Sequence, residues 1–231
     1  MSNLKGVGVA LVTPFHEDLS VDFESLTKLV DFNIENGSNY LVVLGTTAES
    51  ATLSSTEKSE VINHIIKANN NRVPLVLGIG GNNTMEVKKQ IEETDLSAFE
   101  AVLSVSPYYN KPNQEGLYQH YKVLASTGKK IIIYNVPSRT GQNLEASTTL
   151  RLANDFPNLF LIKEAAPNIL QYFDILRQKP SHFNLVSGDD EYTLPVTLAG
   201  GNGVISVIGQ AYPKEFSTIN NEGFEIFRNA I

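Results

Sequence analysis

Residues 159–165 read Leu-Phe-Leu-Ile-Lys-Glu-Ala, an apolar run that ends in a lysine, Lys163. A continuous apolar run of this length is typical of a strand that is buried on both faces of a parallel sheet. Lysine is rarely fully buried without a partner, so a buried strand that carries one must stabilise its charge or use its amine. Desolvation lowers the pKa of a lysine, and the neutral amine can then attack a carbonyl to form a Schiff base. The alternative is a structural Lys163 that reaches solvent at the strand end or pairs with Glu164.

Strand-like runs of the same character recur along the chain, and helical patterns separate them. One of these helices is expected to open at Ser54-Ser55-Thr56-Glu57, which has the form of a capping box. The expected strands are residues 6–15, 40–47, 74–81, 101–109, 130–137, 159–165, 183–189 and 203–210. Eight strands that alternate with helices are the number that closes a (β/α)8 barrel. The pattern therefore favours the α/β class and a TIM barrel, with an open doubly wound sheet as the competing fold.

The predicted barrel accounts for residues 1–212 as one catalytic domain, and residues 213–231 form a short C-terminal helical tail. This tail can supply part of an eighth helix and one short apolar-faced segment at residues 224–227. That is thin coverage for the outside of the eighth strand, and it leaves apolar surface open. We therefore expect a truncated or incomplete C-terminal helical region.

The composition and the absence of several motifs argue against some classes of function. The 231 residues carry a net charge of −7 and no Lys/Arg block, which argues against a nucleic-acid surface. The chain has no cysteine, and its four histidines do not pair at metal-ligand spacing, so we expect no metal site. Walker, dinucleotide-binding and Gly-x-Ser-x-Gly motifs are absent, so no cofactor is expected. Without a signal sequence or an apolar run of membrane-spanning length, we expect a cytoplasmic protein with no membrane partner.

Hydroxyl groups follow three of the predicted strands, at the barrel end where active sites lie. Thr46, Tyr109 and Tyr134 come from the second, fourth and fifth strand ends, and Lys163 lies on the sixth. A Schiff-base reaction must move protons to and from the amine, and hydroxyl groups can relay them. Each residue alone is more commonly a turn or rim-packing residue, but their convergence around a lysine is informative.

A carboxylate-bearing substrate also needs hydrogen-bond donors. Arg139 offers a planar bidentate fork, and Thr47 with the backbone amides of residues 45–47 offers a second carboxylate site. The alternative for Arg139 is a surface ion pair. Asp189 and Asp190 follow the seventh strand, where we expect them to cap the next helix.

Five motifs occur in order at the predicted strand ends: GTTAES (45–50), SPYYNKP (106–112), YNVPSRTG (134–141), IKEA (162–165) and GVISV (203–207). Together they resemble the family of dihydrodipicolinate synthases and N-acetylneuraminate lyases, which are class I aldolase barrels. The resemblance covers residues from about 6 to 216. Within this family, the chain resembles the dihydrodipicolinate synthase branch in Arg139 and in the two threonines of GTT. The sialic-acid lyases usually lack that arginine.

The resemblance implies a lyase of lysine (diaminopimelate) biosynthesis. Its substrates would be pyruvate and L-aspartate 4-semialdehyde, and its product 4-hydroxy-tetrahydrodipicolinate. Lys163 matches the Schiff-base lysine, and Tyr134, Thr46 and Tyr109 match the proton relay. In the family the last of these reaches in from a neighbouring subunit, which implies a homo-oligomer, either a dimer or a homotetramer. The alternatives are another pyruvate-dependent aldolase, such as an N-acetylneuraminate lyase, and a non-catalytic truncated barrel that acts in binding or assembly.

The same resemblance assigns substrate contacts. Arg139 matches the residue that holds the carboxylate of the semialdehyde, and Thr47 matches a pyruvate-carboxylate contact. Gly188 and Ile205 match backbone positions that shape the pyruvate pocket.

An allosteric cleft for feedback inhibition by lysine is also implied. The matching residues are Ser50, Ala51, Asn82, Glu86 and Tyr108. Ser55 and Lys58 stand where inhibited members often carry histidines. Because a lysine at position 58 would repel a cationic effector, we expect weak inhibition by lysine or none.

Overall fold

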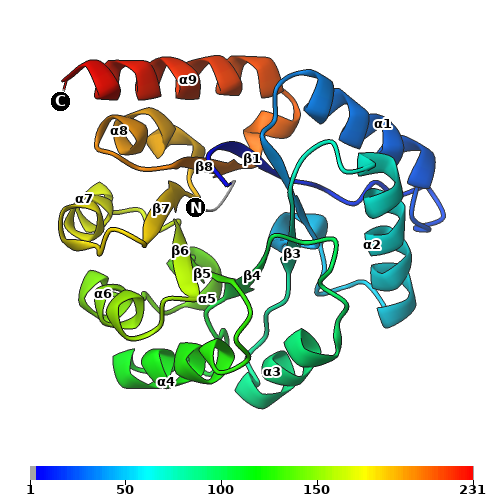
Figure 1. The fold of residues 1–231 in the computed structure, drawn as a ribbon. Helices are drawn as coiled ribbons and strands as arrows, with labels where there is room; N and C mark the ends of the chain where they lie inside the picture. Colours follow the sequence, from blue (N-terminus) through cyan, green and yellow to red (C-terminus); the bar gives the residue numbers. More distant parts are fainter. Residues whose placement is uncertain (1–3, 231) are drawn as a thin grey trace.

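The chain forms a closed barrel of eight parallel strands, paired in the order of the sequence, with β8 next to β1 (Figure 1). The structure is a computed structural model and describes residues 4–230, apart from the side chains of residues 227, 228 and 230. The strands are β1 (Gly6–Ala10), β2 (Tyr40–Val43), β3 (Leu75–Gly78), β4 (Ala101–Val105), β5 (Ile131–Asn135), β6 (Leu159–Glu164), β7 (Asn184–Ser187) and β8 (Gly203–Ser206). The predicted TIM barrel is confirmed, and the open doubly wound sheet is excluded.

Helices surround the strands on the outside of the barrel (Figure 1). They are α1 (Phe23–Glu35), α2 (Ser55–Asn69), α3 (Thr84–Glu93), α4 (Gln114–Ala125), α6 (Ala146–Asp155), α7 (Ile169–Gln178), α8 (Thr193–Leu198) and α9 (Pro213–Ala230). The short helix α5 (Pro137–Thr140) instead follows β5 at its carboxyl end. Three short 3-10 turns follow strands: η1 (Thr46–Ala48), η2 (Asp190–Tyr192) and η3 (Ile208–Gln210). The predicted capping box opens α2, since Ser54 accepts from the Glu57 amide and Glu57 accepts from the Ser54 amide.

Helix α9 occupies the predicted C-terminal tail. It packs against α8 and β1, so it covers the barrel wall where the last strand meets the first (Figure 1). The contact with α8 is close at Gly223, where an added Cβ would lie 3.1 Å from the Thr197 side chain. In the described part of the chain, the tail residues therefore form a continuous outer helix against α8 and β1.

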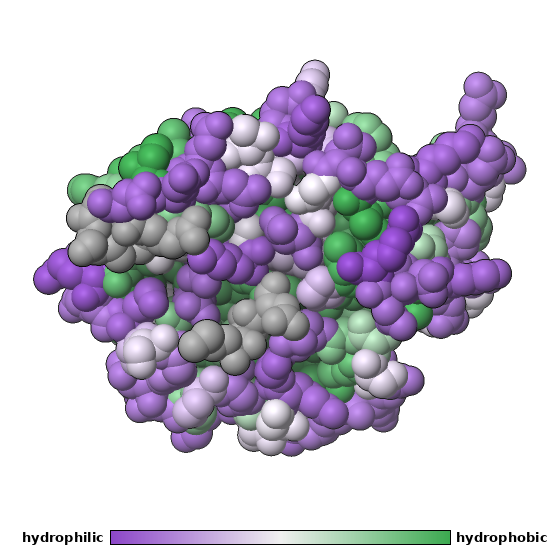
Figure 2. Space-filling view, turned by 45° about the horizontal axis from the view of Figure 1, so that its top comes forward, coloured by the Kyte–Doolittle hydropathy of each residue, from purple (hydrophilic) through white to green (hydrophobic). Residues whose placement is uncertain are grey.

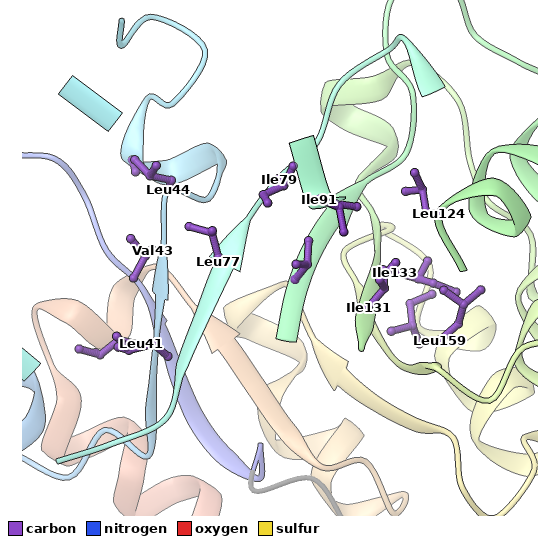
Figure 3. Close-up of a cluster of buried hydrophobic side chains, with 14 of the residues drawn as sticks. Leu41, Val43, Leu44, Leu77, Ile79, Ile91, Leu124, Ile131, Ile133 and Leu159 are labelled. Atoms are coloured by element: carbon purple, nitrogen blue, oxygen red, sulfur yellow. The ribbon is translucent and has the colours of Figure 1, made fainter. Parts of the chain in front are cut away.

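Two hydrophobic clusters lie on opposite sides of the strands. The outer one fills the space between strands and helices, where Leu77 and Ile133 on strands lie near Ile91 and Leu124 on helices (Figure 3). The inner one lies inside the barrel and includes Tyr40 from β2. Alternate residues of each strand supply the two clusters, as the two-residue period of a strand requires.

Strand β6 contains an irregularity that changes this alternation. Ile131 on β5 is aligned with Leu159, but the next residue, Ile132, is aligned with Leu161, so Phe160 is an extra residue. Leu159 belongs to the outer cluster, whereas Leu161 belongs to the inner one. The bulge therefore sets the phase of the rest of β6, in which Lys163 follows Leu161 on the interior side.

Polar residues make up most of the surface in the view of Figure 2, and hydrophobic residues show as separate areas, several of them in recesses. Scattered apolar surface of this kind is ordinary for a folded protein. Among the described residues, no helix is long and apolar enough to cross a membrane.

The inner cluster gives a test of barrel packing. Tyr40 is fully buried, fills the space beside Gly8, and its hydroxyl lies 3.4 Å from the Val204 carbonyl oxygen. Tyr40→Ala should lower the free energy of unfolding by about 3–5 kcal/mol because it empties this space. Tyr40→Phe keeps the ring and should cost about 1 kcal/mol. Urea unfolding of both variants measures the difference, and equal losses would contradict the packing role of the ring.

Candidate functional site

Lys163 lies near the end of β6 with only 3% of its surface exposed. Tyr134 on β5 and Val186 on β7 are its neighbours in the sheet, and both belong to the inner cluster. The Lys163 amine lies 4.4 Å from the centre of the Tyr134 ring. Glu164 follows on the opposite face of the strand, where its carboxylate binds other partners, so the two residues do not form the ion pair considered above.

Two residues of the predicted relay lie together. Thr46 is in η1, immediately after the Gly45 turn that follows β2, and its hydroxyl lies 3.5 Å from that of Tyr134. Tyr134 therefore lies between the amine of Lys163 and the hydroxyl of Thr46. Tyr109 is different: it adopts a φ of 71° and is 89% exposed, so its ring projects away from its own barrel.

Gly188 follows β7 and leaves room for the lysine side chain. A Cβ at this position would lie 2.9 Å from Cε of Lys163 and 2.8 Å from Cβ of Ala165. The Gly188 amide donates to the Glu164 carbonyl oxygen at 2.6 Å, which holds the loop against β6. Ile205 on β8 is fully buried in the inner cluster. Both predicted pocket-shaping residues thus belong to the barrel interior or its rim.

A cavity of about 750 Å³ opens at the strand ends, and Lys163, Gly188 and Ile205 are not among the residues that line it. Thr46, Tyr134 and Arg139 line one part of it, and Arg139 is presented by the short helix α5 directly after β5. Thr47 lies next to Thr46 in η1 and is half-buried. Because Tyr134 also contacts Lys163, its ring connects the buried amine to the cavity.

Three of the five residues assigned to the lysine cleft line the same cavity. Ser50, Ala51 and Tyr108 line it, and so do Ser55 and Lys58. Asn82 precedes α3 and Glu86 lies in its first turn, and neither is among the residues that line the cavity. The Asn82 carbonyl oxygen accepts a hydrogen bond of 3.2 Å from the Asn110 side chain, in the loop that carries Tyr108 and Tyr109.

Sequence reasoning missed a polar cluster behind the lysine. Glu164 is fully buried, and its carboxylate accepts hydrogen bonds from the Asn135 side chain, the Ala166 amide and the Gln171 side chain, at 2.8, 2.8 and 2.9 Å. Burial raises the pKa of the Glu164 carboxyl to about 7, although these hydrogen bonds oppose the rise. The sequence did contain a signal for this cluster. Asn135 and Glu164 directly follow Tyr134 and Lys163, and because side chains alternate along a strand, both lie on the outer face, where they are aligned with each other.

The expectation that the Asp189 and Asp190 side chains cap the next helix is wrong. Asp189 occupies the position before η2, but its side chain makes no capping hydrogen bond there. The Asp190 carboxylate instead accepts from the amides of Val207 and Ile208, at 3.1 and 3.0 Å. It therefore stabilises the turn after β8, a contact between distant segments that local sequence does not reveal. No group of three or more His, Cys, Asp or Glu residues that could hold a metal ion occurs within residues 4–230.

The architecture is thus a (β/α)8 barrel with an interior lysine at the carboxyl end of the sixth strand, beside two hydroxyl groups and an arginine. The profile of the Dihydrodipicolinate synthetase family matches residues 3–226, and the chain belongs to this family. A curated relative from Flavobacterium psychrophilum, named 4-hydroxy-tetrahydrodipicolinate synthase, is 58% identical over 221 residues, which are 95% of this chain and 75% of the relative.

Solved structures agree with this assignment. A chloride-inhibited dihydrodipicolinate synthase from Acinetobacter baumannii, complexed with pyruvate, is similar with a TM-score of 0.92 and 40% identity, over 98% of this chain and 78% of the other. A structure described as the first monomeric dihydrodipicolinate synthase variant has a TM-score of 0.93 and 39% identity, over 97% of this chain and 76% of the other.

The contact at Gly188 gives a second test. Gly188→Ala would place a methyl group into Lys163 and Ala165, and such overpacking should lower the free energy of unfolding by about 1–3 kcal/mol. Gly45→Ala is the matched control, because its Cβ would meet Val42 at 3.5 Å, an ordinary contact. Urea unfolding compares them, and a Gly188 variant as stable as the control would refute the close approach.

Proposed function

We propose that this chain catalyses the condensation of pyruvate with L-aspartate 4-semialdehyde to 4-hydroxy-tetrahydrodipicolinate, as a lyase of lysine biosynthesis. The observation that carries the proposal is Lys163 itself, a buried amine in the barrel interior whose neighbour Tyr134 borders a cavity. Membership of the family supports the reaction, since relatives that are about half identical carry the name of this synthase. Arg139 on the cavity wall favours the synthase over an N-acetylneuraminate lyase.

In the first stage the neutral Lys163 amine attacks the C2 carbonyl carbon of pyruvate. The nitrogen gives up a proton and the carbonyl oxygen takes one, which yields a carbinolamine. Its hydroxyl then takes a second proton and leaves as water. Tyr134 can deliver that proton, because its hydroxyl lies in a chain with that of Thr46 and its ring contacts the lysine. The resulting iminium loses a proton from C3 and becomes an enamine.

In the second stage the enamine C3 attacks the aldehyde carbon of the semialdehyde, and the aldehyde oxygen takes a proton. The semialdehyde amine then attacks the iminium carbon, the ring closes, and the Lys163 amine is released. Arg139 is suited to hold the carboxylate of the semialdehyde because its guanidinium is a bidentate donor on the cavity wall. Thr47 and the turn amides beside it are the proposed contacts for the pyruvate carboxylate.

We further propose that the site is completed by a second copy of the chain, in a dimer or a homotetramer. Tyr109 is 89% exposed, so it is free to enter a neighbour's site rather than its own. Among similar proteins a monomeric variant has been described, so the oligomeric state of this chain is a matter for direct measurement. A cytoplasmic location stays a prediction.

The Schiff base has a direct test. Borohydride reduction in the presence of pyruvate should add the reduced pyruvate mass to Lys163, as located by peptide mass spectrometry. Lys163→Arg should abolish this adduct and lower kcat by at least about 10³-fold, because arginine cannot form the Schiff base. Lys67→Arg, an exposed lysine on α2, is the control and should leave both unchanged. No adduct on Lys163 in the folded parent chain would refute the mechanism.

Feedback by lysine should be weak. Lys58 lines the cavity beside Ser50 and Ala51, and its charge should keep inhibition by millimolar lysine below about twofold. Titrating the initial rate with lysine measures this, and clear inhibition of the parent chain would contradict it. Lys58→Gln removes the charge and should increase inhibition, whereas Lys67→Gln should not.

A further inference from the structure

A buried polar network lies directly behind the proposed catalytic face of β5 and β6. Its centre is Glu164, whose two carboxylate oxygens accept three hydrogen bonds, from β5, from α7 and from the segment that follows β6. No ion pair to Glu164 is found among the described residues, so hydrogen bonds alone compensate its burial. A buried group with this many donors is costly to disturb, and it fixes the position of each element that supplies one.

The network extends to the chain that follows Arg139. The Asn135 side chain also accepts from the Leu144 amide at 2.9 Å and donates to the Asn143 side chain at 2.8 Å. The Asn143 side chain in turn donates to that of Gln171 at 2.8 Å. The loop after α5, the helix that carries Arg139, is therefore tied to the same carboxylate as β5 and α7.

Each anchor of the network is covalently next to a residue of the site. Asn135 follows Tyr134, and Glu164 follows Lys163. Backbone hydrogen bonds also hold these two anchors. The Ala165 amide donates to the Asn135 carbonyl oxygen at 2.9 Å, and the Gly188 amide donates to the Glu164 carbonyl oxygen. A shift of either outer side chain would therefore move the inward side chain beside it.

We propose that Glu164 is a positioning residue for the condensation: its carboxyl group holds β5, β6 and the loop after α5 in one arrangement, so that Tyr134, Lys163 and Arg139 keep their productive positions. The inference rests on the proposed function, because it assigns Glu164 to the Schiff-base site. Reaction rates are sensitive to such placement, since a misplacement of about 1 Å can cost about 100-fold.

Other titratable groups lie near Glu164, but none of them accepts the hydrogen bonds that its carboxylate accepts. Tyr121 on α4 and Tyr172 on α7 face it, and burial raises the pKa of each, so both hydroxyl groups stay neutral. The Tyr121 hydroxyl lies 3.0 Å from the Ser104 carbonyl oxygen and 3.4 Å from the Tyr134 amide and carbonyl oxygen, so it supports the backbones of β4 and β5 and is not one of the donors to Glu164. The side chain of Lys163 lies on the other face of the strand. Glu164 is thus the acceptor on which the three donor groups converge.

Glu164→Gln is the sharpest test because it keeps the shape of the side chain. The amide oxygen can still accept from Asn135 and Ala166, but the amide nitrogen would face the donor of Gln171. We expect the variant to fold. Its kcat and the rate at which it forms the borohydride-trapped pyruvate adduct should each fall at least about tenfold, with a smaller change in KM. Glu60→Gln, an exposed glutamate on α2, is the matched control and should stay within about twofold of the parent chain.

The outcomes separate the two proposals. If the parent chain itself forms no adduct on Lys163, the proposed function fails and the positioning role fails with it. If the parent forms the adduct and folded Glu164→Gln only melts at a lower temperature, with kcat and trapping rate within about twofold, Glu164 merely stabilises and the positioning role is overturned. Should Glu164→Gln not fold, Asn143→Ala loosens the same network from the loop after α5 and is judged by the same two rates.

Discussion

The bulge at Phe160 is the constraint on which the proposed active site depends. In a regular strand that began with Leu159 facing the helices, every second residue would face them too, and Lys163 would lie in the outer layer. The extra residue shifts the phase by one, so that Leu161 and Lys163 face the barrel interior. Bulges commonly change the direction of side chains next to active sites. Here the bulge is the reason that the amine of Lys163 lies inside the barrel.

The same phase shift places Glu164 on the outer face, and the two faces of β6 then have different environments. On the inner face the lysine amine contacts the Tyr134 ring beside a cavity. On the outer face the carboxylate accepts three hydrogen bonds from neighbouring elements. Because adjacent residues share a peptide bond, strong fixation on one face limits movement on the other. A reactive side chain can thus remain free of strong partners while its backbone is held firmly.

Much of this could be predicted from sequence. The continuous apolar runs gave the eight strands and the barrel, because parallel strands covered on both faces have that composition. The convergence of Thr46, Tyr134 and Arg139 followed from their positions at strand ends, which a barrel gathers on one face. The phase of Lys163 did not follow, since Leu159 to Ile162 are apolar on both faces and conceal the bulge. Nor did the partner of Asp190, or the network of Glu164, since these contacts join segments that are distant in sequence.

Tyr134 completes the physical picture, because three separate contacts meet at this one residue. Its ring contacts the amine of Lys163, its hydroxyl lies 3.5 Å from that of Thr46, and its carbonyl oxygen accepts from the Ser106 amide on the β4 side. The side chain of Tyr134 is thus contacted from β6 and η1, and its backbone is fixed from the β4 side, so the ring has little freedom to leave the amine. Tyr109, by contrast, is 89% exposed on a loop with positive φ, so its own barrel buries little of its ring. The rigid part of the proposed relay therefore belongs to the barrel interior, whereas the Tyr109 ring lies at its exposed rim.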